Sequence, residues 1–241
     1  MTPGDVAAKA FLRVTDAVFR ARRVIGRIED ALAPKIEVTE PPPPATPRRS
    51  ILFVTVDQQR HDALGITGGT VARTPVIDAV GKAGLVYRRA HVHNVVCMPS
   101  RATMLTGQYP RTHGVIANGI PLPHDAPSVA EYLRVAGGYR TALLGKAHFD
   151  PHLDPLLSFA ENHLAARARP AIWRGFEHVE LATHGPLGGH HYAVWLRSQH
   201  PGEVAGFGGV LTGAAGGDTA APEVTHNRIA REHYHTDWVA D

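Results

Sequence analysis

The longest periodic pattern of the chain covers residues 5–33. Apolar side chains recur there at alternating spacings of three and four residues, at Phe11, Val14, Val18, Ala21, Ile25, Ile28 and Leu32. This spacing places them along one face of a helix, while Arg13, Arg20 and Arg27 follow a second face at intervals of seven. The pattern therefore predicts one amphipathic helix over residues 5–33.

Two roles are open for this helix. It can dock on its own domain or on a partner subunit, or it can lie as a basic surface helix on anionic lipid. The acidic side chains Asp16, Glu29 and Asp30 are interspersed among the basic ones, which favours docking. We therefore expect a contact within the protein or in a homo-oligomer, with a membrane-surface contact as the alternative.

Two segments predict strands. Residues 51–56 form a continuous run rich in β-branched side chains, which suits a strand buried on both faces of a parallel sheet. Residues 139–144 predict a second strand, after a helix whose start at Ser128 is marked by a capping-box pattern with Glu131. Together these elements indicate an α/β protein.

The elements suggest three parts. An amphipathic helical extension covers residues 1–34, and the proline-rich residues 35–50 form a stiff linker. The α/β domain then occupies residues 51–241.

Composition narrows the functional classes. The 241 residues could bury a substantial core, and the net charge of +3 comes without a continuous basic face, so we expect no nucleic-acid partner. Charged residues interrupt the N-terminus, so no signal peptide is expected, and no apolar run is long enough to span a membrane. We therefore expect a cytoplasmic protein. The sixteen histidines make proton transfer or metal binding plausible.

Cys97 is the only cysteine, so it cannot form an intrachain disulfide. It precedes Pro99, Ser100 and Arg101 and a helix-forming run, which indicates that it lies where a loop enters a helix. The open amides of the first turn, with Arg101 one turn inside, create an electropositive pocket for an oxyanion. The alternative is a small buried hydrophobic side chain.

Polar side chains follow both predicted strands, where ligands of open α/β sheets collect. Asp57 and Gln58 offer oxygen ligands for a hard divalent cation, although Asp57 could instead cap the following turn. Lys146 and His148 lie two residues apart on an extended segment, so we expect them to point the same way. Ordinary surface residues are the alternative for this pair.

The stretch Cys97-x-Pro99-Ser100-Arg101, continued through residues 102–114, resembles the signature of the sulfatases, members of the alkaline-phosphatase-like superfamily. The resemblance implies a mixed, mostly parallel sheet flanked by helices, and hydrolysis of a small sulfated substrate. It also implies that a formylglycine-generating enzyme, reading Pro99 and Arg101, oxidises Cys97 to formylglycine. The hydrated aldehyde of formylglycine would then be the nucleophile.

The same resemblance implies a ligand set and substrate contacts. Asp57, Gln58 and the converted Cys97 would bind a divalent metal, Ca²⁺ with Mn²⁺ or Mg²⁺ as alternatives. Lys146 and His148 match a Gly-Lys-x-His element of sulfatases that binds the sulfate and leaving oxygens.

Three further positions bear on this reading. Asn118 would contact the substrate, or simply form the Asn-Gly turn. Arg60 would orient the Asp57 carboxylate. Gln58 stands where many sulfatases have a second aspartate and also resembles phosphonate monoester and phosphodiester hydrolases, which therefore remain the alternative function. The Lys146 and His148 pair favours a sulfatase.

Length is the main departure from the family. Sulfatases are much longer than 241 residues, and their second metal pair and a further substrate lysine come from sequence that would follow Asp241. We therefore expect an N-terminal portion that is incomplete at its C-terminus and lacks part of the site. A noncatalytic truncated protein, whose helix at 5–33 recruits a partner, is the third hypothesis.

Overall fold

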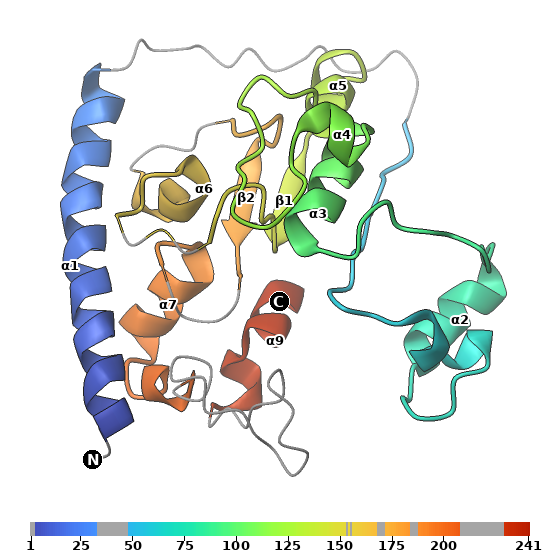
Figure 1. Cartoon of the computed structure of the whole chain (residues 1–241), viewed down its shortest axis with the longest axis horizontal. Coiled ribbons are helices and arrows are strands. Elements are labelled where there is room, and N and C mark those ends of the chain that lie inside the picture. The colour runs from blue at the N-terminus through green and yellow to red at the C-terminus, as the bar shows by residue number, and fades with distance from the viewer. Residues whose placement is uncertain are drawn as a thin grey trace. The chain divides into compact units, whose positions relative to one another are not determined.

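The computed structural model describes residues 3–32, 48–152, 154, 156–167, 172–183, 188–207 and 229–241. The chain divides into two compact units, residues 1–43 with 93–241 and residues 44–92, and each unit is described by itself (Figure 1). Most of the expected linker over residues 35–50 lies outside the described residues. The predicted division at residue 50 therefore stays a prediction.

The unit of residues 44–92 contains three short helical elements. They are the 3-10 turns η1 (His61–Ala63) and η2 (Gly65–Thr67) and the helix α2 (Pro75–Ala83). The Asp78 carboxylate accepts the Ile66 N–H at 2.8 Å, which ties α2 to η2. None of the described side chains in this unit is buried.

The strand expected over residues 51–56 does not form. These residues belong to no helix or strand, and the side chains of Leu52 and Phe53 are 88% and 73% exposed. A strand that is buried on both faces needs paired neighbours. Among the described residues of this unit no second strand is present, so the apolar run has no sheet to join.

The larger unit contains a two-stranded parallel sheet. Strand β1 (Ala142–Gly145) pairs with β2 (His178–Leu181), with Ala142 opposite His178 and Gly145 opposite Leu181. The chain between the two strands includes α6 (Ala160–His163) and η3 (Leu164–Ala166). The predicted α/β class is confirmed, and β1 lies at the end of the run over residues 139–144 that predicted a strand.

Helices surround this sheet (Figure 1). The remaining elements are α3 (Cys97–Thr106), α4 (Pro110–His113), α5 (Val129–Val135), α7 (His191–Gln199), η4 (Val204–Phe207), η5 (Arg231–His233) and α9 (His235–Ala240). Helix α5 begins after the predicted cap, since Ser128 Oγ accepts the Glu131 N–H at 3.4 Å.

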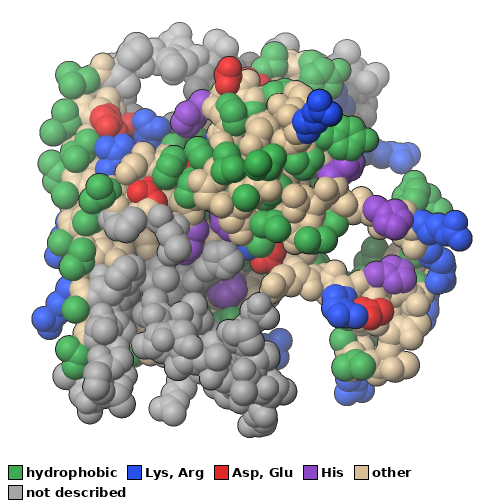
Figure 2. All heavy atoms as spheres, viewed as in Figure 1, with side chains coloured by type: hydrophobic (Ala, Val, Ile, Leu, Met, Phe, Trp, Pro, Cys, Tyr) green, Lys and Arg blue, Asp and Glu red, His purple; other side chains and the backbone are tan. Residues whose placement is uncertain are grey.

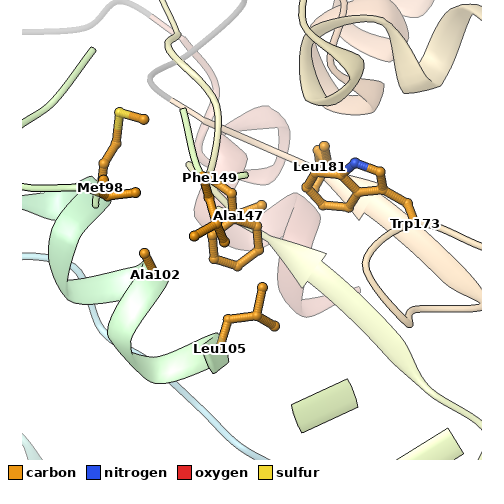
Figure 3. Packing of buried hydrophobic residues seen from close by; sticks show 9 residues of the cluster. Met98, Ala102, Leu105, Ala147, Phe149, Trp173 and Leu181 are labelled. Carbon is orange, nitrogen blue, oxygen red and sulfur yellow. The ribbon is translucent and has the colours of Figure 1, made fainter. Parts of the chain in front are cut away.

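The main core joins α3 to the segment that follows β1. Met98, Ala102 and Leu105 are spaced by four and three residues, so they share one face of α3. They pack in one buried cluster with side chains from beyond β1 and from β2, among them Ala147, Phe149, Trp173 and Leu181 (Figure 3). This packing holds the start of α3 near the end of β1.

Helix α1 (Pro3–Leu32) forms where the periodicity predicts a helix, and it docks on its own unit. Phe19 is 6% exposed and packs in a small cluster with Leu157 and Ala166. Two acidic side chains of the helix pair with arginines from elsewhere, as Arg197 Nε lies 2.9 Å from Asp16 Oδ1 and Arg167 Nε lies 3.6 Å from Asp30 Oδ1.

The docked face holds little of the apolar stripe. Val18 is half-buried and packs against the cluster of Phe19, but Val14, Ile25, Ile28 and Leu32 are exposed at 62%, 45%, 54% and 80%. Figure 2 shows hydrophobic side chains along the edge that α1 forms. Docking thus uses Phe19 and charged side chains, because arginines elsewhere in the fold offer partners for the acids of α1. Among the described helices, none is both long and apolar enough to cross a membrane.

Candidate active site

The start of α3 carries the candidate nucleophile. Cys97 is the first residue of the helix and is half-buried, as the loop-to-helix pattern predicted. Asn118, expected at a substrate contact or in a turn, accepts the N–H of Met98 through its Oδ1 at 3.0 Å. Asn118 therefore helps to fix the backbone next to Cys97, because it satisfies an amide of the first helical turn. A substrate contact of Asn118 stays a prediction.

Arg101 connects α3 to the end of β1. The residue lies one turn inside the helix, and its Nη1 donates a hydrogen bond to the Lys146 carbonyl oxygen at 2.5 Å. The two residues are 45 positions apart in the sequence. This hydrogen bond brings two predicted site residues together, and the core contacts between Ala102 and Phe149 in the same cluster support that arrangement.

Lys146 and His148 follow β1, as predicted, but not on an extended segment. Gly145 has φ +93° and His148 has φ +58°, so the left-handed conformation interrupts the alternation of a strand. Lys146 is half-buried, and His148 is only 5% exposed. Regular strand geometry, from which a shared direction of the two side chains was expected, is therefore absent at His148.

Glu161 holds the backbone after Lys146 in this conformation. Its carboxylate accepts three consecutive amide N–H groups, from His148 at 2.7 Å, Phe149 at 2.7 Å and Asp150 at 3.0 Å. The side chain is fully buried, and that burial raises the pKa of Glu161 to about 7, with the nearby Asp150 adding to the rise and the N–H groups opposing it. Nothing in the sequence around Glu161 signals this role.

Three further histidines lie close to the same segment. The His152 ring is centred 6.5 Å from that of His148 and 5.7 Å from that of His190. Burial lowers the pKa of His152 and of His235, and the charge of Lys146 lowers both further. These two imidazoles are therefore neutral at neutral pH.

His190 is buried although glycines precede it in the sequence. Its side chain is only 1% exposed and its Nε2 lies 3.1 Å from Asn162 Oδ1. Histidine is often buried when a polar partner is available. The sequence pattern could not reveal Asn162, which lies 28 residues earlier.

Two of the three predicted metal ligands belong to the unit of residues 44–92. Asp57 and Gln58 are consecutive exposed residues in a turn, and Gln58 has φ +55°. Arg60 was expected to orient Asp57, but it donates two hydrogen bonds to Asp62, at 2.8 and 2.6 Å. A ligand set of Asp57, Gln58 and Cys97 therefore stays a prediction.

The donor chemistry of the pair fits a hard cation. Asp57 and Gln58 offer a carboxylate and a carboxamide oxygen side by side in the sequence, and Ca²⁺ and Mg²⁺ take oxygen ligands. Two residues fill only part of a coordination shell of about six to eight oxygens. The pair therefore suits one side of such a site.

Comparisons with known proteins find similarity in one segment of the chain. Residues 49–153 match the family model described as Sulfatase. An ulvan-active sulfatase of Formosa agariphila is 40% identical over 103 residues, which are 43% of this chain and 20% of that protein. An arylsulfatase of Clostridium perfringens is 31% identical over 104 residues, which are 42% of this chain and 21% of that protein.

A solved structure also aligns. The crystal structure of the phosphonate monoester hydrolase of Agrobacterium radiobacter matches 62% of this chain and 28% of its own, with 29% identity and a TM-score of 0.46. The chain spans about a fifth of the length of the two sulfatases that it matches.

Proposed function

We propose, since residues 49–153 match the sulfatase family model, that this chain carries the nucleophile-bearing part of a sulfate ester hydrolase. The two sulfatases are longer, so the proposal concerns the activity of a protein that contains this segment. The proposed nucleophile is made from Cys97, and the proposed substrate is a small sulfated molecule.

The observation that supports the proposal most is the hydrogen bond from Arg101 to the Lys146 carbonyl oxygen. It joins the helix that begins with Cys97 to the strand end that carries Lys146 and His148. A sulfuryl group in transfer gains negative charge on its oxygens, and preorganised cations lower the energy of that charge. Arg101 and Lys146 are two such cations, the first in α3 and the second directly after β1.

The roles of the individual residues follow from their chemistry. Oxidation of Cys97 to formylglycine would supply an aldehyde hydrate, of which one hydroxyl attacks sulfur and the other allows sulfate to be released. Arg101 orients the substrate oxygens through its planar fork of donors. Lys146 neutralises charge on a nonbridging oxygen, and His148 supports the leaving oxygen.

A divalent cation is part of the proposal. Asp57 and Gln58 would hold it through their side-chain oxygens, and when bound it would polarise a sulfate oxygen as a Lewis acid. Calcium is the first choice, and Mn²⁺ or Mg²⁺ would use the same oxygens. A formylglycine-generating enzyme is the partner that the conversion of Cys97 requires.

The test is hydrolysis of an aryl sulfate by the protein isolated from its native host, together with its intact mass. We expect a mass that shows the Cys97 thiol replaced by an aldehyde, and activity that Cys97→Ala abolishes. Cys97→Ser should stall after one transfer, because a serine ester lacks the second hydroxyl. Met104→Ala, at an exposed position of the same helix, should leave the rate unchanged.

Three results would contradict the proposal. Steady turnover by Cys97→Ser would show that hydrolysis does not need the hydrated aldehyde. A faster reaction with an aryl phosphonate ester than with the aryl sulfate would assign the alternative, a phosphonate or phosphodiester hydrolase. An intact thiol without hydrolysis of either ester would assign a noncatalytic protein.

A further inference from the structure

We propose that His200, Glu203 and His233 form a zinc site, separate in its residues from the proposed reaction centre. One ligand atom of each side chain lies within 4.8 Å of the other two. Zinc bonds to histidine nitrogen and carboxylate oxygen are about 2.0 to 2.2 Å long, so two ligand atoms of one ion lie at most about 4 Å apart. Because the two imidazoles are stacked, closing this group around an ion requires one ring to turn about its Cβ–Cγ bond until both nitrogens face the ion.

The backbone brings two of the ligands together. His200 follows the end of α7, and its carbonyl oxygen accepts the Glu203 N–H at 3.0 Å. This turn fixes the spacing of a histidine and a carboxylate three residues apart. The third ligand, His233, lies at the end of η5, thirty residues beyond Glu203.

Other contacts orient the carboxylate and the second histidine. Glu203 Oε2 accepts the Ala230 N–H at 3.0 Å, while its Oε1 lies 2.7 Å from His233 Nδ1. Tyr192, which is fully buried, donates its hydroxyl to the His233 carbonyl oxygen at 2.9 Å. Such supporting hydrogen bonds are typical around metal ligands, because they fix orientation before the ion arrives.

The two imidazoles face one another. Their ring centroids are 3.6 Å apart at an interplanar angle of 24°, and the Trp195 ring lies 5.0 Å from His200 and 5.9 Å from His233. The side chains of His233 and Glu203 are 22% and 27% exposed, so an ion can reach them from solvent. Two imidazoles and one carboxylate favour zinc over calcium, which prefers oxygen ligands.

Zinc would take the place of the proton between His233 and Glu203, since their hydrogen bond uses a nitrogen and an oxygen that would both bind the ion. The site would also fasten the C-terminal segment to α7, because His233 stands just before α9. In α9, Val239 lies near Gly145 at the end of β1.

The test is a titration of the full chain with zinc against a chromophoric chelator. We expect one tightly bound ion per chain, with an affinity that falls at least tenfold in His200→Ala, His233→Ala and Glu203→Gln. The matched control is His178→Ala. His178 forms an exposed pair with Glu180 at 3.0 Å and belongs to no three-ligand group among the described residues, so its removal should not change the affinity.

A second measurement separates lost ligands from lost folding. Zinc should raise the melting temperature of the wild-type chain and of His178→Ala, but not that of Glu203→Gln, whose circular dichroism should match wild type. Equal zinc affinity in wild type and in all three ligand variants would overturn the proposal, as would the absence of a tight site. Neither result tests the proposed sulfate ester hydrolysis through Cys97, which is measured separately by the rate of ester hydrolysis.

Discussion

At the scale of single residues, the fold depends most clearly on Glu161. One buried carboxylate satisfies three consecutive amides of the segment that carries His148. His148 has a left-handed backbone, a conformation that costs free energy for a residue other than glycine. The hydrogen bonds to Glu161 therefore stabilise a backbone conformation that the residues of this segment would not favour by themselves.

Replacing Glu161 with glutamine tests this role. The carboxamide keeps the size of the side chain but exchanges one acceptor oxygen for an NH₂ group, which leaves at least one buried N–H unsatisfied. We expect the free energy of unfolding to fall by about 1 to 3 kcal/mol, measured by urea denaturation. Glu177→Gln, at a less buried position, is the control. Equal effects of the two substitutions would contradict the role of Glu161.

The raised pKa of Glu161 predicts a pH dependence with a definite sign. The folded pKa is about 7 and the ordinary value is 4.5, so between these values the folded state retains a proton that the unfolded state has lost. The contribution of Glu161 to stability is therefore full below pH 4.5 and declines as pH rises toward 7. Urea denaturation over this range should show a decline in wild type that is absent from Glu161→Gln.

At the scale of elements, α1 shows what a periodic pattern can and cannot predict. Its spacing gave a helix, and the structure has a helix over Pro3–Leu32. The same spacing suggested that the apolar stripe would dock, yet of its large side chains Val14, Ile25, Ile28 and Leu32 face solvent and Val18 packs against the unit. The docked face depends on Arg167 and Arg197, which lie more than a hundred residues away, and periodicity within one segment carries no information about them.

A pair of substitutions on α1 distinguishes its two faces. Phe19→Ala removes a side chain that is 6% exposed and should cost about 3 kcal/mol of stability, because it leaves a cavity under the helix. Val14→Ala on the outward stripe, at 62% exposure, should change stability by less than about 0.5 kcal/mol. Urea denaturation followed by helical circular dichroism measures both. A larger loss from Val14→Ala would reverse the assignment of the docked face.

The candidate site also combines features that depend on neighbouring residues with features that depend on contacts between distant segments. The position of Cys97 at the start of α3 follows from neighbouring residues, and so does that of Lys146 after β1. Their connection through Arg101 rests on a contact across 45 residues. Glu161 and the buried His190 could not be predicted, since their partners are set by how distant segments pack. The prediction of a strand over residues 51–56 was wrong because a strand requires a neighbouring strand with which to pair.

At the scale of the whole molecule, burial differs sharply between the two units. The described part of residues 44–92 has no buried side chain, whereas α3 buries Met98, Ala102 and Leu105. Regions with few buried contacts open at lower free energy. We expect amides of α2 to exchange with deuterium at least about tenfold faster than those of α3, which is a difference of about 1.4 kcal/mol. Mass spectrometry of peptides from the full chain measures this, and equal protection would contradict it.

The pairing of acids on α1 has an electrostatic consequence for the surface. Asp16 and Asp30 are engaged by Arg197 and Arg167, and Glu29 is engaged by Arg22 of the same helix. The side chains of Arg13, Arg20, Arg23 and Arg27 are exposed. The potential outside α1 is therefore more positive than a count of its own charged residues suggests, since Asp16 and Asp30 are offset at short range by arginines from outside the helix. Polyanions approaching this face would be attracted over about one Debye length, and added salt would shorten that reach.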